Sequence, residues 1–104
     1  MDEALQAVLD ELHRHGAEHD AGKADRLARL RNVEPDSARV LAVLVPATAA
    51  RHVLEIGTSN GYSTLWLADA VRSVGGHLVS VDIEAGRSAL AAQNLERAGL
   101  RELV

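Results

Sequence analysis

Two short apolar segments joined by one helical segment constrain the fold of this chain more than any other feature. Residues 52–56 and 77–81 have the length and apolar content of strands, and residues 62–73 between them carry apolar side chains at helical spacing. Two strands connected in this way pair in parallel through a right-handed crossover. Such units bind ligands beyond the carboxyl ends of their strands, which here are residues 57–61 and 82–84.

Helices are expected before this β-α-β unit. Apolar residues at helical spacing predict a helix over residues 2–15, which Gly16 ends, followed by a polar loop over residues 17–22. A short second helix is expected over residues 23–31.

Two further helices complete the pattern. Asp36 is expected to cap a helix over residues 37–45, and Pro46 ends or kinks this helix because proline lacks a backbone donor and clashes with the preceding turn. The last helix is expected over residues 84–98, with Gly99 as its C-cap.

Composition excludes several classes of function. The 104 residues allow at most one small domain, and a net charge of -4 argues against a nucleic-acid partner, which would require a basic patch. The chain has no cysteine, so it has neither disulfides nor thiolate metal sites. No apolar run approaches the ~20 residues that a membrane span needs. We therefore expect a cytoplasmic protein without membrane or nucleic-acid partners.

The residues after the two strands carry the chemistry. Gly57 lets the chain turn sharply, and Gly61 permits a close backbone approach at the start of the next helix. Glu55 is unusual, because a carboxylate at the end of a buried strand is costly unless it accepts hydrogen bonds or meets a cation. A zwitterionic ligand would satisfy both Glu55 and the helix N-terminus. Asp82 is placed to accept hydrogen bonds from the hydroxyls of a ribose.

Two other nucleotide-binding loops do not fit this sequence. The dinucleotide fingerprint G-x-G-x-x-G needs a middle glycine where this chain has Ser59, and the phosphate-binding P-loop needs a lysine that residues 57–64 lack. Half of a nicotinamide-dependent oxidoreductase is therefore a disfavoured hypothesis.

A resemblance to a known family fits better. Residues 53–64, 66–68 and 76–83 resemble the catechol and caffeoyl-CoA O-methyltransferases, a family of class I S-adenosylmethionine-dependent methyltransferases whose bacterial branch commonly has Gly-Thr-Ser-x-Gly-Tyr-Ser in this loop. Residues 92–100 are similar to the family's helix after the second strand, and the resemblance covers roughly residues 32–104.

The resemblance implies an α/β fold. N-terminal helices over residues 1–35 would precede a cofactor-binding half over residues 36–104, which contains the first two β-α units of a Rossmann-like parallel sheet and stops before the third strand. The family's divalent-metal ligands (for Mg²⁺) and catalytic lysine lie beyond these units, so we expect no metal site and no identifiable catalytic residue here.

The resemblance also implies roles for individual residues at the methionine end of the cofactor. Gly57 and Ser59 would line the methionine moiety, Ser63 would form a hydrogen bond with its carboxylate, and Tyr62 would pack beside it. The segment Asn32-Val33 would close over this end.

At the other positions the resemblance implies that Glu55 supports the loop and the cationic end of the cofactor. Asp82 would hold the ribose hydroxyls, and Ile83 would pack on the adenine. The full set of expected cofactor-binding residues is Glu55, Gly57, Ser59, Gly61, Tyr62, Ser63, Asp82 and Ile83.

Simpler roles remain open for these residues. Gly57 and Gly61 could be ordinary turn residues, and Asp82 could only cap the following helix. Ser63 could be a first-turn residue that contacts no ligand, and Tyr62 could belong to the core.

For Trp66 and the N-terminal histidines, which lie outside the loop, a structural or surface role is preferred over a role in ligand or metal binding. Trp66 is expected in the core, because it lies in the middle of an apolar helical face. His13, His15 and His19 are interpreted as surface residues rather than a metal site.

The sequence therefore predicts the cofactor-binding part of a methyltransferase that acts on the oxygen of a small, catechol-like acceptor. The alternative is a non-catalytic cofactor-binding or interaction module that a partner chain completes. In either case two strands with open outer edges favour self-association or a partner that supplies further strands. We expect residues 1–104 alone to be inactive.

Overall fold

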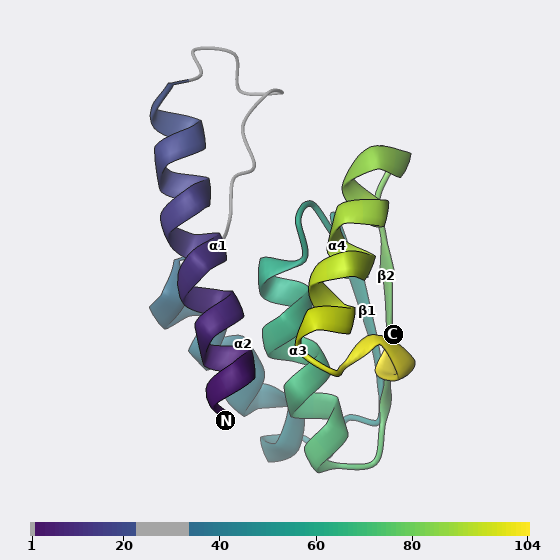
Figure 1. Ribbon diagram of the computed structural model, residues 1–104. Helices are drawn as coiled ribbons and strands as arrows, with labels where there is room; N and C mark the ends of the chain where they lie inside the picture. Colours follow the sequence, from purple (N-terminus) through teal and green to yellow (C-terminus); the bar gives the residue numbers. More distant parts are fainter. Residues whose placement is uncertain (1, 23–33) are drawn as a thin grey trace.

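A two-stranded parallel sheet runs along one side of the molecule, with helices packed beside it (Figure 1). The structure is a computed structural model that describes residues 2–22 and 34–104. The elements in chain order are α1 (Glu3–Ala21), α2 (Pro35–Ala47), β1 (His52–Ile56), α3 (Tyr62–Ser73), β2 (His77–Val81), α4 (Ala85–Arg97) and a 3-10 turn η2 (Arg101–Leu103).

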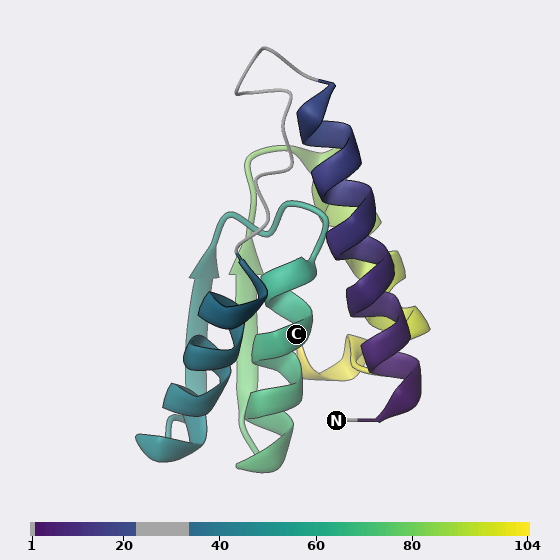
Figure 2. The same ribbon diagram turned by 90° about the vertical axis from the view of Figure 1, so that its left-hand side faces the viewer.

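The β-α-β unit is confirmed. Both strands and α3 have the predicted bounds, and β1 pairs with β2 in parallel from His52↔His77 to Ile56↔Val81. In Figure 2, α2 and α3 lie in front of the two strands. The strand side chains therefore divide into two groups: those that face α3, and those that point to the opposite face of the sheet.

Helix α3 supplies the centre of the core. Leu65, Ala68 and Val71 are fully buried, and Trp66 is 8% exposed, so the prediction that Trp66 is a core residue is confirmed. The fully buried side chains that surround α3 in the same cluster come from α1, α2, β2 and the segment after α4, and include Leu5, Ala38, Leu78 and Leu100. The core is thus built mainly from aliphatic side chains, as the low aromatic content requires.

The predicted end of the first helix at Gly16 is wrong. Helix α1 continues through Gly16 to Ala21, so the predicted loop over residues 17–22 is mostly helical. Gly16 is buried and continues the apolar row of Leu5, Leu9 and Leu12 at intervals of three to four residues. Packing along this row outweighs the cost of about 1 kcal/mol that an internal glycine imposes on a helix.

The predicted start of the next helix is also displaced. Helix α2 begins at Pro35 with Glu34 as its N-cap, and proline is well suited to this first position because its missing N–H would have no partner there. Asp36 therefore lies in the first turn rather than at the cap, and its carboxylate is 3.2 Å from Arg39 Nη1. Pro46 lies in the last turn, and the helix ends one residue later.

The end of α4 agrees with the sequence prediction. Gly99 has a positive φ of 74°, the Gly99 N–H donates to the carbonyl of Glu96 at 3.0 Å, and the Leu100 N–H donates to that of Leu95 at 2.9 Å. These two bonds form a Schellman motif, in which a left-handed residue ends the helix and the following apolar residue is buried.

Three expectations lie outside the described residues. The short helix over residues 23–31 and the proposed closing segment Asn32-Val33 make up two of them, and the third is the part of the N-terminal segment over residues 23–33. Among the residues that the structure does describe, no helix combines the length and apolar character that a membrane crossing requires.

Gly76 precedes β2 at a close backbone contact and provides a test of the packing. A Cβ at this position would lie 2.6 Å from the carbonyl oxygen of Arg51, whereas a Cβ at Gly86 would meet nothing within 4 Å. We expect Gly76→Ala to lower the free energy of unfolding by about 1–3 kcal/mol, as overpacking typically does. Urea denaturation measures the change. Gly86→Ala is the matched control and should be neutral or slightly stabilising, so equal effects of both changes would contradict the described packing.

Candidate functional site

The loop between β1 and α3 is held in place by the end of β2. The N–H groups of Gly57 and Thr58 both donate to the carbonyl oxygen of Val81, at 2.7 and 3.2 Å. Gly57 has a φ of +96°, and Ser59 has the left-handed φ of 52° that non-glycine residues seldom adopt. The loop therefore has a defined shape that the neighbouring strand imposes.

Gly61 ends the loop against helix α4. Its φ is +93°, and a Cβ at this position would lie 3.1 Å from the Cβ of Ala91. The expected close backbone approach at Gly61 is thus confirmed, and its partner is α4. A second contact joins the same elements, since the Asn94 side chain donates to the carbonyl oxygen of the buried Asn60 at 2.8 Å.

Asp82 joins the two loops at the carboxyl ends of the strands. Its Oδ2 accepts from the Ser59 N–H at 2.8 Å, and its Oδ1 accepts from the Glu84 N–H at 2.9 Å. The backbone N–H of Glu84, followed by that of Ser59, lowers the pKa of Asp82 below its ordinary value. The carboxylate is therefore charged and fixed in orientation, and its two oxygens together have lone pairs beyond those that accept these backbone donors.

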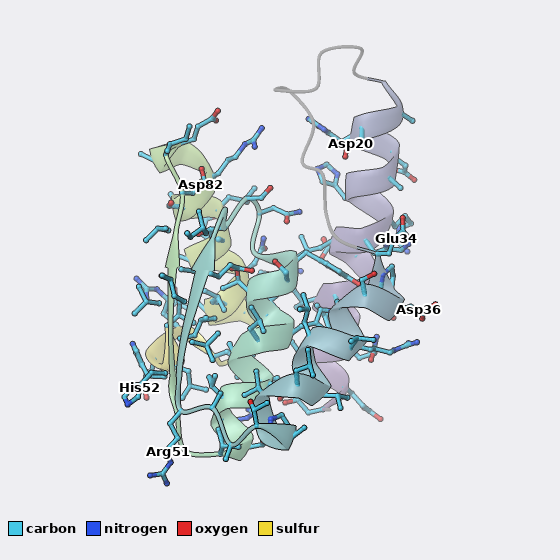
Figure 3. All side chains as sticks on the ribbon, turned by 180° about the vertical axis from the view of Figure 1, so that it is seen from behind. Asp20, Glu34, Asp36, Arg51, His52 and Asp82 are labelled. Atoms are coloured by element: carbon cyan, nitrogen blue, oxygen red, sulfur yellow. The ribbon has the colours of Figure 1, made fainter. Side chains whose placement is uncertain are left out.

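A cleft of about 370 Å³ opens beside Asp82. Figure 3 shows Asp82 at the opposite end of the sheet from Arg51 and His52, so the cleft lies at the edge where ligands of parallel sheets bind. The cleft combines apolar side chains with two carboxylates and one guanidinium; its lining residues are Ile56, Gly57, Val81, Asp82, Ile83, Glu84 and Arg87. The Ile83 side chain is fully exposed.

Glu55 lies in a cluster of hydroxyl groups. Its Oε2 accepts from Ser63 Oγ at 2.5 Å, and its Oε1 accepts from Ser80 Oγ at 2.7 Å and from Thr64 Oγ1. Ser80 Oγ is also 2.6 Å from Thr58 Oγ1. The sequence analysis missed Thr58, Thr64 and Ser80. Aligning the two predicted strands at their first residues would have placed Ser80 opposite Glu55, which is the observed register.

Tyr62 belongs to the core in this structure. Its side chain is 3% exposed, and its ring centroid is 6.2 Å from that of His13. Its backbone N–H donates to Asn60 Oδ1 at 3.2 Å.

The predicted site residues fall into two groups. Gly57, Asp82 and Ile83 line the cleft, and Ser59 joins them through its hydrogen bond to Asp82. The others lie deeper, around the first turn of α3 and its contacts, and are Glu55, Gly61, Tyr62 and Ser63.

The histidines of α1 lie away from this cleft. Because α1 is continuous, His15 and His19 are one turn apart, with ring centroids separated by 6.1 Å. Within residues 2–22 and 34–104, no three His, Asp or Glu side chains gather as metal ligands would.

Comparison with known sequences identifies similar enzymes. The chain is 37% identical over 105 residues to a catechol O-methyltransferase of Mycobacterium tuberculosis, with 99% of this chain and 41% of the relative covered. It is 36% identical over 73 residues to a catechol O-methyltransferase of Niastella koreensis, with 70% of this chain and 33% of that relative covered. The chain thus spans between a third and about two fifths of the length of these relatives.

Comparison with solved structures identifies the same class of enzymes as the comparison with known sequences. The O-methyltransferase from Bacillus cereus, solved in complex with SAH, matches with a TM-score of 0.74 at 35% identity over 94% of this chain and 41% of its own. The O-methyltransferase TomG from Streptomyces achromogenes, solved with SAM, matches with a TM-score of 0.71 at 32% identity over all of this chain and 41% of its own. The family model described as "O-methyltransferase" matches residues 2–104. This chain therefore belongs to the O-methyltransferase family, and its fold is that of the class I methyltransferases.

Proposed function

We propose that this chain is the cofactor-binding part of an S-adenosylmethionine-dependent O-methyltransferase, and that it binds S-adenosylmethionine or S-adenosylhomocysteine in the cleft beside Asp82. The fixed carboxylate of Asp82 at the mouth of this cleft carries the proposal. It is charged, it retains lone pairs, and it stands where a nucleoside ligand of a parallel sheet places its ribose. We assign this part to residues 36–104 and treat residues 1–35 as a separate N-terminal segment before it.

The cleft fits the adenosine portion of such a cofactor. Asp82 accepts the ribose hydroxyls, and Ile83 offers its exposed side chain to the adenine. Gly57 and Ser59 lie where the ribose connects to the methionine portion, and a side chain at Gly57 would be strained by its φ of +96°. Tyr62 and Ser63, in the first turn of α3, support the methionine end.

The cofactor supplies an activated methyl group, and the residues of this chain contribute orientation. Methyl transfer is a displacement at carbon whose rate depends strongly on alignment of the donor and the acceptor. Asp82 and the loop at Gly57–Gly61 hold the donor by contacts at both ends. A small hydroxylated, catechol-like acceptor is proposed from the names of the two curated relatives. The family resemblance implies that a divalent metal such as Mg²⁺ would assist such an acceptor in the complete enzyme.

A second candidate function rests on the uncovered face of the sheet. Leu54, Ile56, Val79 and Val81 are exposed on the face opposite α3. A non-catalytic binding module that a partner chain completes would bury Leu54 and Val79, and would leave Ile56 and Val81 to the cofactor cleft. Such a module would bind the cofactor and would gain stability from its partner.

Isothermal titration calorimetry with two ligands tests the proposed function. We expect S-adenosylhomocysteine to bind, and we expect NAD not to bind, because Ser59 occupies the position at which a dinucleotide loop needs glycine. Binding of NAD without binding of S-adenosylhomocysteine would contradict the proposal. Methyl transfer by the complete enzyme, assayed on a catechol, then distinguishes the enzyme from the binding module.

A further inference from the structure

The hydroxyl cluster around Glu55 has only one consistent arrangement of protons. An ionised carboxylate can only accept hydrogen bonds, and each serine or threonine hydroxyl has a single proton to donate. Ser80 donates its proton to Glu55 Oε1 at 2.7 Å. In the 2.6 Å contact between Ser80 and Thr58, Thr58 is therefore the donor. Ser63 and Thr64 donate to Glu55 as well, so four hydroxyl protons are oriented by one carboxylate.

This cluster connects four segments of the chain. Glu55 is on β1, Ser80 is on β2, Thr58 is in the loop, and Ser63 and Thr64 are in the first turn of α3. Three of these segments also line the cleft: β1 through Ile56, the loop through Gly57, and β2 through Val81. The loop is bonded on its other side to Val81 and Asp82 through backbone N–H groups, so the hydroxyl cluster and the strand end hold it from two directions.

Glu55 does not face the cleft. Residues alternate between the two faces of a strand, so Glu55 and Val53 share the face towards α3, while Ile56 lies on the opposite face and lines the cleft. Glu55 is not among the described residues that line the cleft. The three hydroxyls already provide the carboxylate with strong, charge-assisted donors. A cation is therefore not required to compensate for its burial.

We propose that Glu55 is a positioning residue, which fixes the loop and the first turn of α3 through the oriented hydroxyls, and that it is not the partner of the cofactor's ammonium group. This inference rests on the proposed function, because it concerns the same cofactor. The family resemblance implied two roles for Glu55, support of the loop and contact with the cationic end of the cofactor. The inference keeps the support of the loop and excludes the contact with the cofactor. Ser80 shares the role, because it relays the orientation from Glu55 to Thr58 in the loop.

Two ligands that differ at the amino-acid end test this assignment. S-adenosylhomocysteine carries an ammonium and a carboxylate, whereas 5′-methylthioadenosine has the same adenosine and thioether without either group. Glu55→Gln retains the shape of the side chain but replaces one acceptor oxygen with an NH₂ donor, which conflicts with at least one hydroxyl proton. We expect this variant to bind both ligands more weakly by the same factor, roughly tenfold, as for the loss of one charged hydrogen bond.

Ser80→Ala provides the second test. Ser80 does not line the cleft, yet its loss removes the partner of Thr58 and one of the two hydroxyl donors to Glu55 Oε1. We expect this variant to weaken both ligands equally too, although by a smaller factor. Ser88→Ala is the matched control, because Ser88 lies with Ser80 between β2 and α4 but is outside the cluster; its affinities should match the wild type. If Glu55→Gln does not fold by circular dichroism, Ser80→Ala decides alone.

The ratio of the two affinities separates the outcomes. An unchanged ratio with both affinities reduced supports the positioning role. A tenfold or larger loss for S-adenosylhomocysteine alone in Glu55→Gln, with wild-type affinity for both ligands in Ser80→Ala, would mean that Glu55 binds the ammonium, and this result would overturn the inference. Wild-type affinity in both variants would overturn it as well. Failure of the wild-type chain to bind either ligand would instead overturn the proposed function.

Amide hydrogen exchange of the two variants adds a local readout. A positioning role predicts faster exchange confined to residues 57–64, with exchange in α1 unchanged. A general loss of stability would not confine the change to these residues.

Discussion

Replacing Asp82 with alanine is expected to weaken the binding of S-adenosylhomocysteine by roughly 1.5–3 kcal/mol for each charged hydrogen bond to the ribose that is lost. This corresponds to a rise in Kd of about 10- to 150-fold. The structure adds a second contribution, because the same carboxylate accepts the N–H groups of Ser59 and Glu84. Loss of these bonds loosens the loop and the start of α4, so the effect should lie at the upper end of this range.

Calorimetry measures this change, and two variants separate its causes. Asp82→Asn keeps one acceptor oxygen and should show an intermediate loss, while Asp10→Ala removes an exposed carboxylate on α1 and should leave affinity unchanged. Circular dichroism verifies that the fold is intact. An unchanged affinity in Asp82→Ala would assign Asp82 only to the support of the helix that follows it.

Self-association of the 104-residue chain is the second large effect that we expect. Leu54, Ile56, Val79 and Val81 are 64%, 82%, 51% and 45% exposed and form two facing pairs across the strands. Full burial of each such side chain contributes about 1.5–3 kcal/mol. The outer edges of β1 and β2 have no strand neighbour among the described residues, and open edges promote pairing with another chain. We expect dimers or larger species at micromolar concentration.

Size-exclusion chromatography with light scattering measures the association. The double substitution Leu54→Thr with Val79→Thr retains strand propensity while it reduces the apolar surface, and it should shift the chain towards the monomer. Val40→Thr with Val43→Thr is the matched control on the exposed apolar face of α2. A larger shift towards the monomer with the control pair would indicate that the chains associate through α2 instead of the sheet. A stable monomeric wild type would contradict the prediction of self-association. The same preparations should show no methyl transfer to a catechol, because Glu55 does not line the cleft and Asp82 is assigned to the ribose of the cofactor, so neither carboxylate is left to deprotonate an acceptor.

The β-α-β unit was predictable because its signals are local. The apolar strands, the turns at Gly57 and Gly61, and the helix over residues 62–73 each follow from residue type and spacing, and their bounds are confirmed. The errors in the predicted helix bounds arise where tertiary packing, and not local sequence, determines where a helix ends. Gly16 was read as the end of a helix, but it is buried in the contact row of α1, and no local rule distinguishes a terminal glycine from a packed one.

The site was only partly predictable for a related reason. Asp82 and the glycine loop were identified from their positions after the strands, and the cleft forms there. The partners of Glu55 depend on the register of the sheet and on the first turn of α3, which bring together residues that are up to 25 positions apart. Single hydroxyl residues such as Ser80 carry no signal of their own until the strands are aligned.

Hydrogen exchange with and without S-adenosylhomocysteine tests the central proposal most directly, because it reports both binding and its location and tolerates association. We expect slower exchange in residues 57–64 and 80–87, which include the loop and the cleft, and unchanged exchange in α1, which does not line that cleft. Exchange that is unchanged at saturating ligand, or protection confined to the groove between α1 and α4, would contradict the assignment of this cleft as the cofactor site.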